Sequence, residues 1–153
     1  MASNRHLGRI VALQSLYEFE FRSQLNDSSV DSEEIYNRNV ERYRAEIDDL
    51  GFIQSLVKGV IDHTAELDET LSPLAPEWPI DQIARVDRSI LRLGLYELLH
   101  CKDQVPPKVA INEAVELAKA FGSDNSSKFI NGVLGTAYRT LVEEKSDNGS
   151  QES

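Results

Sequence analysis

The sequence predicts an all-α protein built from two helical halves, and three observations support this. Apolar residues recur every three or four positions along most of the chain, which is the spacing of a helix with one buried face. No segment alternates apolar and polar residues as a half-buried strand does. Pro73, Pro76 and Pro79 interrupt the helical pattern near the middle of the chain, so the two halves divide there.

The composition is that of a globular protein without disulfides or membrane spans. The chain has 153 residues, of which 41% are hydrophobic, enough for one core-bearing domain or two small subdomains. Its single cysteine, Cys101, cannot form an intramolecular disulfide, and no stretch approaches the roughly 20 apolar residues of a membrane span. We therefore expect a cytoplasmic protein.

The net charge of −10 is concentrated in one part of the chain. Residues 25–72 carry twelve acidic and four basic side chains, whereas residues 1–24 and 73–145 are nearly neutral. The field of the whole molecule opposes nucleic-acid binding, but the two nearly neutral regions leave room for local contacts with phosphates.

The first half contains three predicted amphipathic helices. The first covers about 4–24, the second opens at Asp31, which with Glu34 resembles a capping box, and the third covers about 50–71. The buried face of the first helix is predicted to contain Leu7, Ile10, Val11, Leu13, Leu16, Tyr17 and Phe21. Three such helices bury their apolar faces most simply against one another as a small bundle.

The second half contains three further predicted helices, one over 81–100 that Asp81 caps or opens and two within 105–135. Proline at 106 and 107 favours a helix start, because the missing N–H groups need no partner there. Gly122 stands where a left-handed closing residue is expected. Gly132 and Gly135 predict close approach of another backbone, either within the chain or from a second copy.

The segment Ser72–Ile80 is the expected boundary between the halves. Trp78 lies in it and is more typical of a residue that fills a gap between substructures than of one that binds a ligand. We expect an N-terminal helical subdomain at 1–72, a C-terminal one at 73–145 and a disordered tail at 146–153.

Basic residues at the start of the first helix are electrostatically unfavourable. Arg5, His6 and Arg9 lie in its first two turns, where the helix dipole disfavours each cation by about 0.3–1 kcal/mol. A phosphate-bearing ligand would resolve this conflict, because helix N-termini bind anions. The alternative, that these side chains only solubilise a frayed helix end, is equally consistent with the sequence.

The sequence contains no pattern that supports catalysis or metal binding. It has no Gly-rich phosphate loop and no Cys/His cluster with metal spacing. Glu113 and Glu116 share a helix face, but the further inward ligands of a di-metal bundle are missing. Arg85, Arg88 and Arg92 form a basic row, for which a solvated mixed-charge face is favoured over a binding stripe. We therefore expect no enzyme, no cofactor and no metal.

Three segments resemble the NusB family of bacterial transcription antitermination factors: ALQSLYEFEF (12–21), RVDRSILRLGLYELL (85–99) and VPPKVAINEAVELAKAFGSDNSSKFINGVLG (105–135). The resemblance covers most of the chain, weakens between 25 and 81, and is most specific in the last third. It implies a NusB-like fold of two three-helix bundle subdomains packed together, without enzymatic activity. It also implies binding of boxA-type single-stranded RNA together with NusE, a ribosomal protein, in an RNA polymerase antitermination complex that promotes ribosomal RNA transcription.

The resemblance also implies which residues form the sites. The implied RNA-binding residues are Arg5, His6, Arg9, Asn125, Lys128 and Phe129. The implied NusE-facing residues are Asp81 and Asp87, with Arg88 and Arg92 nearby. Relatives can carry a denser basic run where Leu7 and Gly8 stand, so RNA affinity is expected to depend on the partner. Two interpretations of Phe129 stay open, burial in the core and stacking on a base.

Two other functions are compatible with the same fold. RNA methyltransferases can carry a similar helical domain ahead of a catalytic domain that binds S-adenosylmethionine, for which we expect this chain to be too short. A helical protein-interaction module independent of RNA, including a homodimer, is the alternative of a different class. Size measurement and RNA binding would distinguish these functions.

Overall fold

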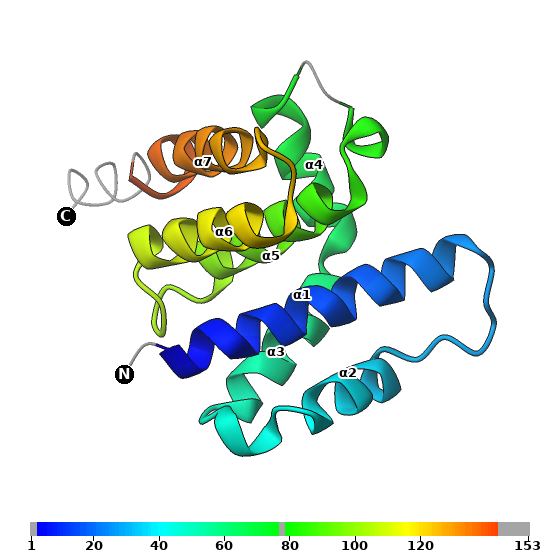
Figure 1. Ribbon diagram of the computed structural model, residues 1–153. Helices are drawn as coiled ribbons and strands as arrows, with labels where there is room; N and C mark the ends of the chain where they lie inside the picture. Colours follow the sequence, from blue (N-terminus) through cyan, green and yellow to red (C-terminus); the bar gives the residue numbers. More distant parts are fainter. Residues whose placement is uncertain (1–2, 77–78, 144–153) are drawn as a thin grey trace. The chain divides into compact units, whose positions relative to one another are not determined.

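The computed structural model describes residues 3–76 and 79–143, and every regular element among them is helical, as predicted (Figure 1). The α-helices are α1 (Ser3–Gln24), α2 (Ser32–Glu41), α3 (Leu50–Asp62), α4 (Thr64–Leu74), α5 (Arg85–His100), α6 (Pro107–Phe121) and α7 (Ser126–Ala137). Two short 3₁₀ turns cover Arg44–Glu46 and Ile80–Gln82, and a π-helical turn at Tyr138–Glu143 follows α7. None of the described helices is long and apolar enough to cross a membrane. Trp78 and the predicted tail lie outside the described residues.

The chain forms two compact units, residues 1–64 and 65–153. The prolines at 73, 76 and 79 predict a boundary between subdomains at 72–80, which stays a prediction. The prediction of one helix over 50–71 is wrong, since α3 ends at Asp62 and α4 begins at Thr64. Between them His63 leaves helical geometry, with φ −111° and ψ 13°, and its Nδ1 lies 2.7 Å from the Gly59 carbonyl oxygen.

In the first unit, α1 packs against α2 and α3 around an aliphatic core. The fully buried side chains of this core include Val11, Ala12, Ile35, Ile53 and Leu56. Asp31 caps α2 as predicted, although its carboxylate accepts the Glu33 N–H and no bond from Glu34 completes a capping box among the described contacts. Tyr17 and Phe21 were predicted to be buried, but they are 39% and 42% exposed.

In the second unit, α5 is the central helix and packs against both α6 and α7 (Figure 1). Its leucines at 91, 93, 95 and 98 are buried, as its nearly all-round apolar pattern predicts. The helix begins at Arg85, so the prediction that Asp81 opens it is wrong. Arg88 explains this difference, because its Nη1 donates to the Ile80 and Ile83 carbonyl oxygens at 3.0 and 2.9 Å and holds a turn ahead of the helix.

The glycines that allow close packing are not those that the sequence indicated. A Cβ atom at Gly132 would have no neighbour within 4 Å, and one at Gly135 would meet only Arg139 Nη1, at 3.5 Å. A Cβ atom at Gly94 would lie 2.7 Å from Leu134 Cδ1 and 3.1 Å from the Ala114 Cβ. Of these three glycines, Gly94 is therefore the one that allows close approach, where α5 meets α6 and α7.

Replacing each of two helical glycines by alanine should separate these environments. Gly94→Ala and Gly132→Ala gain the same helix propensity, about 1 kcal/mol, so the difference between them isolates the steric cost. We expect Gly94→Ala to be less stable than Gly132→Ala by about 1–3 kcal/mol, measured by urea denaturation, because overpacking a core costs that much. Equal unfolding free energies would show that Leu134 and Ala114 move aside without cost.

Candidate nucleic-acid interface

The basic residues at the start of α1 lie against the N-terminus of α3. The Arg5 Nη2 pairs with the Asp49 Oδ2 at 3.0 Å, and the Arg5 guanidinium lies 4.0 Å from the centroid of the Phe52 ring. Arg9 approaches the same ring at 5.8 Å. Asp49 also caps α3, since its Oδ1 accepts the Phe52 N–H at 3.0 Å. Both arginines therefore lie over the Phe52 ring, and Asp49 pairs with Arg5.

In this cluster, a carboxylate of the chain itself offsets positive charge at the start of α1. The hydrogen bond from Arg5, followed by the Phe52 N–H, lowers the pKa of the Asp49 carboxyl below its ordinary 3.8. Asp49 thus supplies an anion that compensates Arg5 within the chain. The Arg5 side chain is 34% exposed, whereas Arg9 is only 2% exposed, so a phosphate has direct access to Arg5 and little to Arg9. His6 is half-buried beside them.

Gly8 is required by packing and explains why this basic segment is short. A Cβ atom at Gly8 would lie 2.5 Å from the Ile53 Cγ1 and Cδ1 atoms, and Ile53 is fully buried. A lysine or arginine at this position would displace the core of the first unit. The gap in the basic run therefore has a structural cause.

The turn between α6 and α7 is fixed to α5 by a buried hydrogen bond. The Ser126 Oγ accepts the Ser123 N–H at 2.8 Å and donates to the Asp87 Oδ2 at 3.0 Å. Ser126 and Asp87 are 2% and 9% exposed. Gly122 is extended, with φ −91° and ψ −171°, so the predicted left-handed closing residue is wrong. A side chain there would still not fit, because its Cβ would lie 2.5 Å from the Ser126 Oγ.

A pocket of about 310 Å³ lies beside this turn and joins residues that the sequence assigned to different ligands. It is lined by Gln82, Ile83, Ala84, Asp87, Ser123, Asn125, Ser126 and Phe129. Phe129 is half-buried and lines the pocket wall. The buried Oδ1 of Asp87 has no hydrogen-bond partner in the described part of the chain. The pocket therefore offers an aromatic side chain and an amide, and an unpartnered carboxylate oxygen is buried in its wall.

The other residues implied for NusE differ in accessibility. Asp81 is exposed in the turn before α5. Arg88 is buried by its bonds to the carbonyl groups of that turn, and Arg92 forms two 2.8 Å bonds with the Asp68 carboxylate of α4. Among these positions Asp81 is the one whose side chain is open to a partner, whereas Arg88 and Arg92 hold the second unit together.

The sequence did not predict an exposed apolar row at the end of α1 and in the turn after it. Tyr17, Phe21 and Leu25 follow one another at four-residue spacing and are 39%, 42% and 65% exposed. In the sequence, the apolar face of the first helix is broader than one row of buried residues needs. The spacing of apolar residues does not show which side of such a face stays exposed to solvent. Rows of exposed large apolar side chains mark protein contacts.

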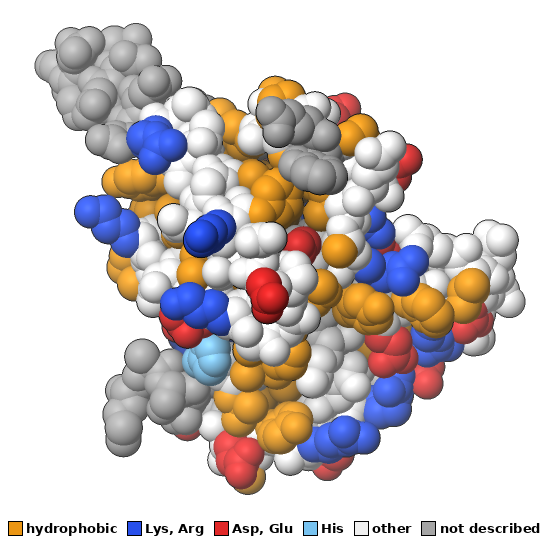
Figure 2. Space-filling model, turned by 45° about the horizontal axis from the view of Figure 1, so that its top comes forward, with side chains coloured by type: hydrophobic (Ala, Val, Ile, Leu, Met, Phe, Trp, Pro, Cys, Tyr) orange, Lys and Arg blue, Asp and Glu red, His pale blue; other side chains and the backbone are white. Residues whose placement is uncertain are grey.

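Among the described residues, the face of the molecule drawn in Figure 2 shows no continuous basic field. On the face drawn in Figure 2, lysine and arginine side chains stand singly or beside acidic ones. With a net charge of −10, any nucleic-acid contact must therefore be local. Lys128 and Asn125 are exposed at the start of α7, next to the pocket that contains Phe129.

Comparison with known proteins adds relatives that match nearly the whole chain. A transcription antitermination protein NusB of Chloroflexus aggregans is 41% identical over 149 residues, which is 97% of this chain and 95% of the relative. The NusB protein of Roseiflexus castenholzii is 44% identical over 137 residues, which is 89% of this chain and 92% of that protein. These relatives are transcription antitermination proteins, in agreement with the expected absence of enzymatic activity.

Solved structures give the same result. A structure of T. maritima NusB matches with a TM-score of 0.79 and 29% identity, and the match covers 94% of this chain and 96% of that one. A crystal structure of the antitermination factors NusB and NusE in complex with double-stranded RNA matches with a TM-score of 0.78 and 27% identity, covering 92% of this chain and 100% of the other. Because the profile of the NusB family also matches residues 6–139, the chain belongs to the NusB family.

Proposed function

We propose that this protein binds boxA-type single-stranded RNA together with the ribosomal protein NusE. It would act in the cytoplasm, in an RNA polymerase antitermination complex that promotes ribosomal RNA transcription. The observation that carries the proposal is the pocket beside the α6–α7 turn, where Asp87, Asn125 and Phe129 meet. The solved complex of a related NusB with NusE and double-stranded RNA supports NusE and an RNA as the two ligands, and the single strand is part of the proposal.

The chemistry of the pocket suits a base that is not paired. An unstacked base can lie on the half-buried Phe129 ring and form hydrogen bonds with the exposed Asn125 side chain. Asn125 can both donate and accept, which suits a base edge. A double helix keeps its bases stacked and its Watson–Crick edges paired, so we infer single-stranded RNA as the ligand, with Arg5 and Lys128 as phosphate contacts.

The exposed parts of α1 and of the turn before α5 suit a protein partner. The row Tyr17, Phe21 and Leu25 provides apolar contact area, and Asp81 provides a negative charge for a basic partner. We propose these residues as NusE contacts. Asp87, which the sequence also placed there, belongs to the RNA pocket in this proposal because it is buried beside Phe129.

The competing function is a homodimeric or other protein-binding module without RNA contact. Gly132 is exposed and an added Cβ there would meet nothing within 4 Å, so α7 leaves room for a second copy at this position. Sedimentation of the protein alone, combined with the RNA titrations below, decides between them. A stable dimer that does not bind RNA even with NusE present would replace the proposed function.

Truncating Phe129 should weaken RNA binding more than it weakens the fold. Base stacking on an aromatic ring contributes about 1–3 kcal/mol, so Phe129→Ala should lower the affinity for boxA-type RNA by about 5- to 150-fold, measured by fluorescence anisotropy with NusE present. Phe121→Ala is the control, because Phe121 is 43% exposed and does not line the pocket. A loss of about 3–5 kcal/mol in unfolding free energy for Phe129→Ala, with normal RNA affinity, would instead assign Phe129 to the core.

Replacing Asp49 should separate its two roles. Asp49→Ser keeps an N-cap acceptor but removes the charge, so stability should fall by about 0.2–1 kcal/mol, whereas Asp49→Ala should cost about 0.5–2 kcal/mol more. Because the pKa of Asp49 lies below 3.8 in the fold, the effect of Asp49→Ser should be present at neutral pH and disappear as the pH falls below that value. Thermal melts at several pH values measure both.

The same Asp49→Ser variant tests whether Arg5 contacts RNA. Removing the competing carboxylate should strengthen RNA binding and steepen the slope of log affinity against log salt by about 0.7, the value for one more phosphate on a single strand. An unchanged slope in Asp49→Ser, together with normal binding by Arg5→Gln, would remove Arg5 from the RNA contacts.

Reversing the charge of Asp81 should weaken binding of NusE. Asp81→Lys places a like charge opposite a basic partner and should lower the affinity by about tenfold or more, with slower association. Asp103→Lys, an exposed acid in the turn after α5, is the control for net charge. If calorimetry gives the same NusE affinity for both variants and the wild type, the turn before α5 is not part of the partner surface.

A further inference from the structure

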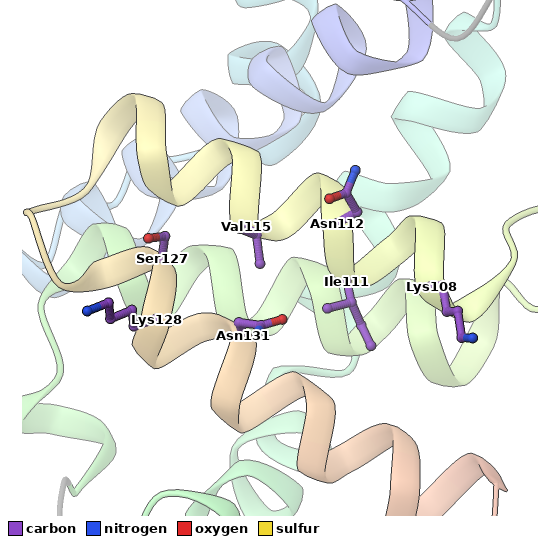
Figure 3. Close-up of a pocket in the computed structure, with 7 residues that line it drawn as sticks. All are labelled: Lys108, Ile111, Asn112, Val115, Ser127, Lys128 and Asn131. Atoms are coloured by element: carbon purple, nitrogen blue, oxygen red, sulfur yellow. The ribbon is translucent and has the colours of Figure 1, made fainter.

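A second pocket, a groove between α6 and α7, is lined by residues that have not been assigned to a site above, except for Lys128. It has a volume of about 400 Å³ and lies within the second unit (Figure 3). Its lining residues are Lys108, Ile111, Asn112 and Val115 from α6, and Ser127, Lys128 and Asn131 from α7. In Figure 3 the two lysines lie at opposite ends, and the Ile111, Val115 and Asn131 side chains lie between them.

The charge in the groove is unusual for this protein. Two ammonium groups and no carboxylate line it, although the chain as a whole carries a net charge of −10. Ile111 and Val115 are half-buried and give the groove an apolar floor, while two carboxamides and a serine hydroxyl supply donors and acceptors. A ligand that fits must combine negative charge with an apolar, hydrogen-bonding body.

Both lysines lie where the helix dipoles add to their positive charge. Lys108 and Lys128 lie in the first turns of α6 and α7, and neither first turn contains an acidic residue. The cap positions, Pro106 and Asn125, make no side-chain capping hydrogen bond. A cation at a helix N-terminus is unfavourable, and an anion bound beside it removes that cost.

We propose that this groove holds a further nucleotide of the single-stranded RNA, with its flanking phosphates at Lys108 and Lys128 and its base over Ile111 and Val115. The inference rests on the proposed function and deepens it. Lys128 lines the groove and the next residue, Phe129, lines the base pocket, so the two sites adjoin at the start of α7. An acidic peptide would satisfy the lysines, but its aspartate and glutamate side chains offer no planar ring for the apolar floor, whereas every nucleotide carries one.

The test compares a short boxA-type RNA with the same RNA lengthened by a few nucleotides at either end, in anisotropy titrations of the full chain with NusE. Lys108→Gln should leave binding of the short RNA unchanged and remove the affinity that the longer RNA gains. Between about 50 and 200 mM salt, the affinity for the longer RNA should fall about 2.6-fold less in Lys108→Gln than in the wild type, because one phosphate contact is missing. Lys119→Gln, on the same helix but outside the groove, is the control of equal charge.

A second variant keeps the test independent of Lys108. Asn131→Asp puts a carboxylate into the groove at an exposed position and should weaken binding of the longer RNA selectively. If the wild type binds RNA but Lys108→Gln and Lys119→Gln behave alike, the groove is not an RNA site, and the proposed function stands. If the wild type binds neither RNA, the proposed function itself fails. Polyglutamate could instead compete for the groove in a way that depends on Lys108, while RNA length has no effect. That result would assign the groove to an acidic peptide and overturn the proposal.

Discussion

The hydrogen bond between the Ser126 hydroxyl and the Asp87 carboxylate fixes the geometry of the second unit at the end that holds the candidate site. It joins the start of α7 to the first turn of α5. The Ser123 N–H donates to the Ser126 Oγ and so links the α6–α7 turn to the same hydroxyl group. Phe129 and Asn125 lie within the pocket that this bond shapes. A buried polar group left without a partner costs about 1–3 kcal/mol of folding free energy. The unpartnered Asp87 Oδ1 therefore destabilises the fold beside the candidate site.

An acidic protein can bind an anionic ligand when its basic groups are placed by local structure and not by a general field. Lys108 and Lys128 lie at two helix N-termini around one groove, and Arg5 lies at a third. Contacts of this kind supply few phosphate interactions, so each adds a small term to the affinity and to its salt dependence. Such a protein gains from a partner that binds the same RNA, as the proposed function requires of NusE.

The sequence predicted the helices best where caps and apolar spacing agreed, as at Asp31, Pro107 and His100. It failed where tertiary contacts overrode a local pattern. Apolar spacing continues across His63, so one helix was expected where two exist, and Arg88 holds a turn that delays the start of α5. Sequence spacing also cannot show which glycine meets a neighbour, and it cannot show that Asp87 and Phe129, 42 positions apart in the numbering, line one pocket.

The first unit shows how packing limits the electrostatics of the proposed RNA contact. Ile53 occupies the space beside Gly8, so the basic segment cannot be continuous. Arg5, the accessible arginine of the cluster, is already paired with Asp49, and that carboxylate also caps α3. A phosphate must therefore compete with Asp49 for Arg5, and the capping bond keeps Asp49 in place during the competition. In the proposed function, this competition makes the contact with RNA weak by itself and leaves the base pocket and the partner to supply affinity and sequence preference.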